Sequence, residues 1–260
     1  VNSSVPSAMP KSSRPQDKVF QICCILSRYG DSEDKYEKHL LTLGDPDPKY
    51  AGEGVHIHRF DVEADLLTGY TDFIRAHNPQ LIVGYNILSF DIPYMIDRAK
   101  KHMCIFDFDR QGFHKYAHAP EKTIKWSSSA YKNQEFQFLD AEGRVYIDLL
   151  PLVKRDFKLN QYKLRTIAMH IVGQTKDDLS PKGIFKCYRI GMRRNEDGTY
   201  GKMARKAMAI VGKYCIQDGV LMNLLMEKLQ TWIGLTEMAS VCNVPIFYLY
   251  TKGQQIKVYS

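Results

Sequence analysis

Residues 84–94 read GYNILSFDIPY, a short polar interruption in an apolar run, and the rest of the chain is interpreted outward from it. The residues before it, PQLIVGYN (79–86), are rich in apolar side chains and bounded by Pro and Gly, which predicts a short strand. Residues 91–103 begin with Asp91 and carry Pro93 in the first turn, which predicts a helix. Asp91 therefore lies where a strand passes into a helix, and we expect it to cap that helix and also to face a metal ion.

A second carboxylate lies in the stretch YCIQDGVL (214–221), within a long helix predicted over about 202–230. Tyr214 and Asp218 are four residues apart, so they share one helix face. Because burying a bare carboxylate is costly, an aspartate beside an apolar stripe needs a partner or a cation. Mg²⁺ prefers oxygen ligands, and two such ions activate water in phosphodiester hydrolysis. Asp91 and Asp218 are therefore candidate metal ligands.

Three further side chains suit the same chemistry. Tyr214, one turn from Asp218, is placed to orient an attacking water. Asn86 is a candidate substrate contact, and Phe90 offers an aromatic face to a base or sugar.

The predicted elements follow an α/β pattern with a mixed sheet. Strands over 18–26, 39–43 and 55–60 are expected to form an antiparallel meander, followed by an amphipathic helix over 63–78. After residues 79–103 comes a segment expected to be irregular (104–134). Two strands then lie within 136–150, and helices follow from 149, over 159–173 and over 202–230.

The motifs carry a resemblance to the family B DNA polymerases, of the delta type and of large DNA viruses. The stretch NPQLIVGYNILSFDIPYMIDRA resembles the family's second exonuclease motif, and YCIQDGVLMNLL resembles its third, Tyr-x-x-x-Asp. Between them, GRVYIDLLPLVKRDFKLNQYKLRTIA matches a further run of the family. Beyond them, EMASVCNVPIFYLYTKGQQIKV resembles the passage into the polymerase palm. The resemblance covers nearly the whole chain in one order.

The resemblance implies an RNase H-like 3′–5′ exonuclease fold and proofreading with two Mg²⁺ ions. Asp91 and Asp218 would be metal-binding carboxylates, Tyr214 would help to place the water, and Asn86 and Phe90 would line the single-strand site. It also implies a primer-template DNA substrate with a single-stranded 3′ end, a sliding clamp or accessory subunits as partners, and a nuclear or viral replication compartment.

The resemblance also predicts the domain boundaries. Residues 1–17 are expected to be a linker, 18–235 the exonuclease domain, and 236–260 the start of the polymerase domain. The chain begins without Met in a Ser/Pro-rich stretch, and we expect the family's first motif, Asp-x-Glu, and its strand to lie upstream of Val1. The chain alone is then expected to show neither nuclease nor polymerase activity.

Asp61 and Glu63, in FDVEAD (60–65), have the spacing of that first motif. They follow the predicted strands and run directly into a helix, where an acidic residue is favoured by the helix dipole. We therefore interpret them as structural. The alternative is a stand-alone DNA exonuclease that uses Asp61, Glu63, Asp91 and Asp218.

The chain is basic, with a formal net charge of +7 and a pI near 9.0. From Lys182 to Lys213 nine basic residues face only two acidic ones. This segment is either a solvated face or a contact for a polyanion, so a non-catalytic single-strand-binding module is a second alternative.

Weaker candidates complete the analysis. The HIH stretch (56–58) is expected to be a surface pair rather than a metal site, and Asp148 is expected to cap the helix after it. The six cysteines form no zinc pattern and are expected to be reduced thiols of an intracellular protein. No apolar run is long enough to predict a membrane span.

Overall fold

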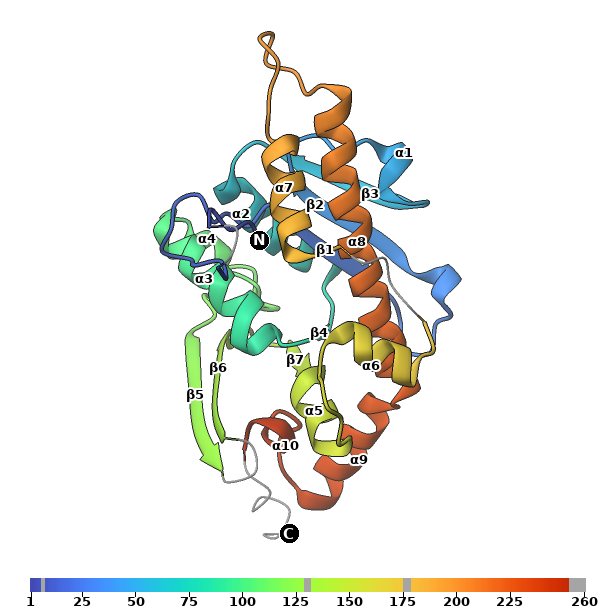
Figure 1. The fold of residues 1–260 in the computed structure, drawn as a ribbon. Coiled ribbons are helices and arrows are strands. Elements are labelled where there is room, and N and C mark those ends of the chain that lie inside the picture. Colours follow the sequence, from blue (N-terminus) through green and yellow to red (C-terminus); the bar gives the residue numbers. More distant parts are fainter. Residues whose placement is uncertain (6–7, 129–131, 175–178, 253–260) are drawn as a thin grey trace. The chain divides into compact units, whose positions relative to one another are not determined.

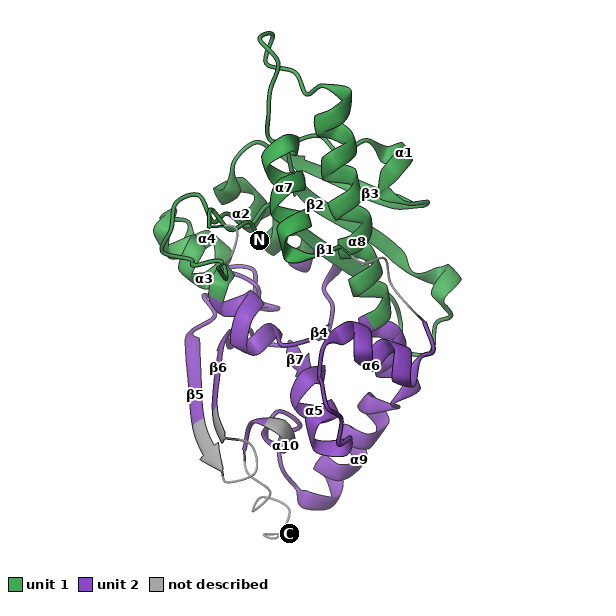
Figure 2. Cartoon of the chain, viewed as in Figure 1, with its two compact units in different colours: residues 1–73, 94–108, 176–221 green, residues 74–93, 109–175, 222–260 purple. Residues whose placement is uncertain are grey.

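The computed structural model describes residues 1–5, 8–128, 132–174 and 179–252. The chain folds into two compact units, each built from three separate segments (Figure 2). Unit 1 comprises residues 1–73, 94–108 and 176–221, and unit 2 comprises residues 74–93, 109–175 and 222–260. Chain segments that are distant in sequence thus build each unit together.

Unit 1 is built on a sheet of three strands in the order β1 (Gln21–Leu26), β2 (Glu37–Leu43) and β3 (Val55–Phe60). The short helix η1 (Glu33–Lys35) lies between β1 and β2, which pair antiparallel as predicted. The antiparallel meander is nevertheless wrong for the second pair, because β2 and β3 run parallel. The connection between them holds a short helix, α1 (Pro48–Ala51), and it is long enough to carry the chain back to the edge where β2 begins.

The helices of unit 1 include α7 (Pro181–Gly191) and residues 202–221 of α8 (Lys202–Lys228), which run alongside each other over the sheet (Figure 1). Two glycines let α8 approach the strands closely. A Cβ atom at Gly212 would lie 2.5 Å from Leu40, and one at Gly219 would lie 2.7 Å from Ile25. The long helix predicted from residue 202 is therefore confirmed, and glycine fixes its distance from the sheet. The remaining helices with residues in unit 1 are α2 (Glu63–His77), α3 (Ile92–Lys101) and α4 (Ile105–Phe108).

The first residues of the chain contain no helix or strand among those described, yet they pack firmly within unit 1. Asp17 is fully buried. Its carboxylate accepts hydrogen bonds from the backbone N–H groups of Ser4 (2.6 Å) and Lys11 (2.9 Å). The Tyr94 hydroxyl donates to the Asp17 carbonyl at 2.7 Å. These bonds tie residues 1–17 to α3.

Unit 2 holds two separate strand pairs. The strands β4 (Leu81–Gly84) and β7 (Val145–Asp148) are parallel, and β5 (Glu121–Ser128) and β6 (Lys132–Leu139) form an antiparallel ribbon. The expectation that 104–134 is irregular is therefore wrong. Residues 121–125 are mostly exposed, so β5 needs no apolar alternation that a sequence pattern would reveal.

The helices of unit 2 are α5 (Leu149–Asp156), α6 (Leu164–Ile171), α9 (Thr231–Cys242) and α10 (Tyr248–Thr251). The helix predicted over 159–173 is shorter than expected, and Gly173, with a φ of 75°, follows its end, as glycine often does at helix ends.

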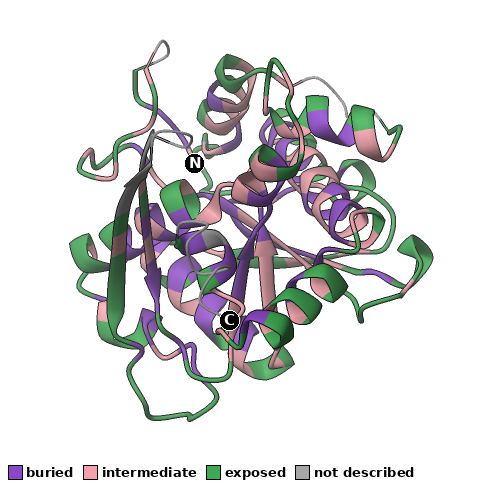
Figure 3. Ribbon diagram, turned by 90° about the horizontal axis from the view of Figure 1, so that it is seen from below, coloured by how far each residue is buried: buried purple, intermediate pink, exposed green. Residues whose placement is uncertain are grey.

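Among the strands, buried positions concentrate on β2, β6 and β7, whereas β1 and β3 are mostly half-buried or exposed. Several helices carry buried positions along one side (Figure 3). In the part of the chain that the structure describes, no helix combines the length and apolarity needed to cross a bilayer. All six cysteines are free thiols.

Candidate functional site

The segment from Gly84 to Ile92 turns the chain from β4 into α3. Asn86 has a left-handed backbone (φ 64°), which asparagine tolerates better than most residues. Residues Ile87–Asp91 then form a single wide helical turn, η2, in which the Ile92 N–H donates to the Ile87 carbonyl five residues earlier. Pro93, which has no N–H to donate, follows at once. Such wide turns are frequent at functional sites.

This geometry corrects the simplest interpretation of Asp91. Helical backbone begins at Ile87 and runs on into α3 at Ile92, so Asp91 lies inside a continuous helical stretch and not at its start. The expectation that Asp91 caps the helix is therefore wrong, while its expected role as a metal ligand stays a prediction. The turn is tight at its start, because a Cβ atom at Gly84 would lie 2.1 Å from Ile87.

The carboxylate that does act as a cap is Asp148, at the end of β7. Its Oδ1 accepts from the backbone N–H of Asn86 (2.7 Å) and of Leu150 (3.1 Å), and its Oδ2 accepts from that of Leu88 (3.1 Å). It is the N-cap of α5, as predicted. Burial raises the pKa of Asp148, even though the three N–H groups favour its charged form. Asp148 thus fixes the backbone of the turn that carries Asn86, Phe90 and Asp91.

The Asp91 side chain keeps solvent-accessible surface, while protein packs densely around it. The surrounding protein displaces water and raises the pKa of Asp91 to about 6, and the negative charge of Asp148 adds to the rise. A bound cation would reverse this effect by favouring the charged carboxylate. On the same turn, Phe90 is half-buried, and the Ser89 hydroxyl donates to the Glu135 carbonyl at 2.9 Å.

Tyr214 and Asp218 lie on α8 within unit 1, and both are half-buried. The prediction that they share one helix face is confirmed by the continuous helix around them. Asp218 precedes Gly219, which packs against β1. A hydrogen bond with Cys215 and burial raise the pKa of Cys23 on β1, and the charge of Asp218 contributes. Asp218 therefore lies close to the Cys23 thiol.

The donor chemistry of these residues suits a hard cation, because Asp91 and Asp218 offer carboxylate oxygens. Within the described ranges no group of three His, Cys, Asp or Glu side chains is arranged to hold a metal ion. Asp148 is fully buried, and its two oxygens accept three backbone hydrogen bonds. Asp91 belongs to unit 2 and Asp218 to unit 1.

Glu63 has a structural role, as interpreted from its position at the start of α2. It is 2% exposed. Its carboxylate accepts from the backbone N–H of Val19 (2.8 Å) and from Arg98 Nε (2.8 Å), and His102 Nε2 lies 2.9 Å from it. Asp61 is exposed and meets only Arg194, at 3.4 Å, among the ion pairs described. A carboxylate held by a buried guanidinium is poorly suited to bind a metal ion.

Sequence reasoning missed two clusters. Arg98 is fully buried and, besides Glu63, donates to backbone carbonyls of residues 12, 14 and 15. A third imidazole, that of His39 on the neighbouring strand β2, lies beside His56 and His58. His39 Nδ1 lies 3.1 Å from His58 Nε2, and the His39 ring stacks on His56. The alternating pattern of the strand indicated that the His56 and His58 side chains share one face of it. It did not indicate which strand lies beside them.

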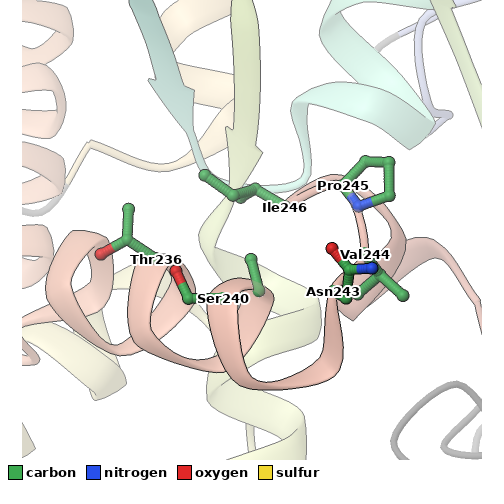
Figure 4. A pocket seen from close by; sticks show the side chains of 7 residues that line it. Thr236, Ser240, Asn243, Val244, Pro245 and Ile246 are labelled. Carbon is green, nitrogen blue, oxygen red and sulfur yellow. The ribbon is translucent and has the colours of Figure 1, made fainter. Parts of the chain in front are cut away.

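A pocket of about 430 Å³ lies at the end of α9 in unit 2 (Figure 4). Figure 4 shows Thr236 and Ser240 on the helix and Pro245 and Ile246 on the segment that follows. Ala239, Asn243 and Val244 complete the lining. No lining residue is an acid or a base, so the polar groups of the lining side chains are two hydroxyls and one amide.

Comparison with known proteins agrees with the motifs. Residues 3–167 match the family described as DNA polymerase family B, exonuclease domain. The whole chain is 51% identical to the DNA polymerase 120R of Invertebrate iridescent virus 3 and covers 22% of it. It is 38% identical to the putative DNA polymerase 060R of Frog virus 3 (isolate Goorha), again over the whole chain and over 24% of that protein.

A cellular protein is also similar. Over 94% of this chain, identity to the DNA polymerase delta catalytic subunit of Schizosaccharomyces pombe is 34%, and 21% of that protein is covered. The chain thus spans less than a quarter of the length of these relatives.

Proposed function

We propose, on the premise that this chain belongs to the exonuclease domain family of the family B DNA polymerases, that it carries most of a proofreading exonuclease domain. Its substrate is the single-stranded 3′ end of a primer-template DNA, and its product is the released 3′ nucleotide. The whole protein extends primers and removes mispaired ends. The observation that carries the proposal is the Asp91 carboxylate, presented at the end of a turn that Asp148 fixes through three hydrogen bonds.

The proposed fold is RNase H-like, with residues 18–235 as the exonuclease domain and 236–260 as the start of the polymerase domain. The mixed parallel and antiparallel pairing of β1, β2 and β3 supports this assignment. So does the placement of Asp91 after β4, because ligand sites in α/β proteins gather beyond strand ends.

The proposed roles follow from the environment of each side chain. Asp91 and Asp218 bind Mg²⁺, which when bound supplies an activated water and neutralises the leaving oxygen. Tyr214 orients the water from one turn before Asp218. Phe90 offers a half-buried ring for stacking against the terminal base or sugar. Asn86 helps to hold the substrate strand, and its left-handed backbone lets the chain turn toward Asp91.

Removing either carboxylate tests these roles. In a polymerase that contains this segment, Asp91→Ala and Asp218→Ala should each slow release of the 3′ nucleotide from a 5′-labelled single strand by more than about 100-fold. Even residues that only support metal ligands change activity by about 10–100-fold. Primer extension should persist. Unchanged 3′ release in both variants would refute the assignment.

Asp61→Asn provides the matched control, since Asp61 is exposed and belongs to the competing Asp-x-Glu interpretation. It should leave 3′ release unchanged. The 260-residue chain alone should release no nucleotide. A metal-dependent activity of this chain that Asp61→Ala abolishes would establish the alternative, a stand-alone exonuclease.

Metal binding is measured separately, by titrating the 260-residue chain with Mn²⁺ in a calorimeter. Asp91→Asn and Asp218→Asn should each weaken binding, whereas Asp61→Asn should not. Equal binding by all three variants would place the ion elsewhere.

A further inference from the structure

The net charge of the chain is concentrated in one segment of unit 1. Between Lys182 and Lys213 nine basic residues face two acidic ones, an excess of seven. The formal charge of the whole chain is also +7, so all other residues together are neutral. A segment with that excess attracts polyanions over a range set by the Debye length.

The fold displays these cations on the outer side of two helices. On α7, Lys182, Lys186 and Arg189 are exposed and follow the spacing i, i+4, i+7 of one helix face. The opposite face packs inward, where Phe185 is buried and Tyr188 contacts Phe20 with ring centroids 4.6 Å apart. The stripe is therefore a surface feature that the core holds rigidly.

The segment after α7 continues the positive surface. Arg193 is exposed in the turn, and Lys202 and Lys206 are exposed and one turn apart at the start of α8. We call Lys182, Lys186, Arg189, Arg193, Lys202 and Lys206 the basic surface. Figure 1 shows the turn projecting beyond the ends of both helices. Among the described residues, none of the six forms an ion pair with a carboxylate.

One of the two acidic residues of the segment, Asp197, is held by hydrogen bonds within the turn. Asp197 accepts from the Thr199 backbone N–H (2.9 Å) and hydroxyl (2.6 Å), and these bonds hold the pKa of Asp197 below its ordinary value. Its carboxylate therefore serves to close the turn around Gly198, which has a φ of 81°.

Aromatic rings lie among the cations. The Arg194 guanidinium lies 4.9 Å from the centre of the Tyr200 ring. Lys206 and Lys49 lie 5.0 Å and 5.8 Å from the centre of the Tyr50 ring, which is 39% exposed. Cations along a backbone path with accessible aromatic rings beside them are the pattern of single-strand binding, because every base has a face that can stack.

We propose that the basic surface binds single-stranded nucleic acid, without sequence preference, through phosphate contacts and stacking on Tyr50. This binding needs neither a metal ion nor a 3′ end, so it goes beyond the proposed hydrolysis at Asp91 and Asp218. Unit 1 would then bind single-stranded nucleic acid through this surface alone.

The test uses a labelled single strand of about twenty thymidines with a blocked 3′ end, in EDTA, by fluorescence anisotropy. Binding should weaken with salt between about 50 and 200 mM, with a slope of about 0.7 per phosphate contacted. The triple variant Lys182→Gln, Lys186→Gln and Arg189→Gln should reduce the slope by about 2, and weaken binding at low salt by more than about tenfold. Tyr50→Ala should weaken binding and leave the slope unchanged.

The control variant removes the same charge elsewhere, through Lys35→Gln, Lys158→Gln and Lys228→Gln, three exposed residues outside the segment. It should bind nearly as the unchanged chain does. Equal losses in the two triple variants would show that only net charge matters and would overturn the proposal. Equal affinity for a duplex, or for vesicles of anionic lipid, would overturn it as well. The triple variant Lys182→Gln, Lys186→Gln and Arg189→Gln should keep the Mn²⁺ affinity of the unchanged chain, which separates this proposal from the proposed hydrolysis.

Discussion

The backbone N–H of Asn86 donates a 2.7 Å hydrogen bond to the carboxylate of Asp148, sixty-two residues later in the chain. Asp148 ends β7 and Asn86 follows the end of the neighbouring parallel strand β4, whose last residue, Gly84, lies opposite Asp148 in the register. A buried carboxylate thereby holds the turn that presents a different, accessible carboxylate, Asp91. The candidate site depends on a residue that does not itself meet the substrate.

Asp148→Asn tests this dependence. The amide can keep one acceptor oxygen, but its NH₂ group would face the N–H of Leu88 or of Asn86 and Leu150. Leaving such donors unpaired costs about 1–3 kcal/mol each, and losing the charge weakens the remaining bonds. We expect the free energy of unfolding to fall by about 2–4 kcal/mol in urea denaturation.

Asp156→Asn is the matched control, because Asp156 is a half-exposed residue at the other end of α5. Its effect should stay within about 0.5 kcal/mol. Equal stabilities of the two variants would show that the three bonds to Asp148 do not hold the turn.

The raised pKa of Asp91 predicts a pH dependence of stability. In the unfolded chain an aspartate has a pKa of about 3.9, whereas in the fold the pKa of Asp91 is about 6. The Asp91 carboxyl group therefore keeps its proton to a higher pH in the folded state than in the unfolded chain. Its contribution to stability is fully present below about pH 4 and is lost as the pH rises through about 6.

Asp91→Asn removes this titration. Unfolding free energies of the unchanged chain and of the variant, measured in urea from pH 4 to 7.5, should diverge, with the variant gaining relative stability as the pH rises. Asp72→Asn, at an exposed position of α2, is the control. Parallel pH profiles for Asp91→Asn and the unchanged chain would show that Asp91 titrates normally.

The network around Glu63 predicts that substituting Glu63 destabilises the fold far more than substituting its neighbour Asp61. Glu63→Gln leaves the Arg98 guanidinium buried without its charge partner, and breaking a buried ion pair costs about 3–5 kcal/mol. Asp61→Asn removes only an exposed pair with Arg194, and such pairs contribute about 0–1 kcal/mol. Thermal and urea unfolding of both variants measure the difference. Comparable effects would mean that Glu63 is not a structural residue.

Local sequence predicted much of this fold because local physics decided it. The run LIVG predicted β4, the spacing of Tyr214 and Asp218 predicted a shared helix face, and Asp148 before an apolar helix predicted an N-cap. Each of these depends on residues within about one helical turn or one strand. The comparison with family B polymerases then agreed with the motif order.

The predictions that were wrong or incomplete concern features that are determined by residues distant in the sequence. Whether β3 joins β2 parallel or antiparallel depends on the path of the connection through α1, which no pattern in β3 encodes. The wide turn at Ile87–Asp91 depends on Pro93 lacking an N–H and on a carboxylate from β7. Glu63 was correctly interpreted as structural, yet its partner Arg98, thirty-five residues later, resembles any surface arginine in the sequence.

Glycine at position 219 sets the distance between α8 and β1, and so the position of Asp218. A Cβ atom there would lie 2.7 Å from Ile25 and 3.2 Å from the Cys23 sulfur, so Gly219→Ala must push the helix outward. Overpacking of this kind costs about 1–3 kcal/mol, which exceeds the gain of about 0.5–1 kcal/mol from replacing a helical glycine.

Gly234→Ala, in α9, is the control, because open space surrounds its Cβ position. It should raise the unfolding free energy by about 0.5–1 kcal/mol. If Asp218 binds Mn²⁺, Gly219→Ala should also weaken Mn²⁺ binding, and Gly234→Ala should not. Stabilisation by both substitutions would show that α8 and β1 are not in close contact.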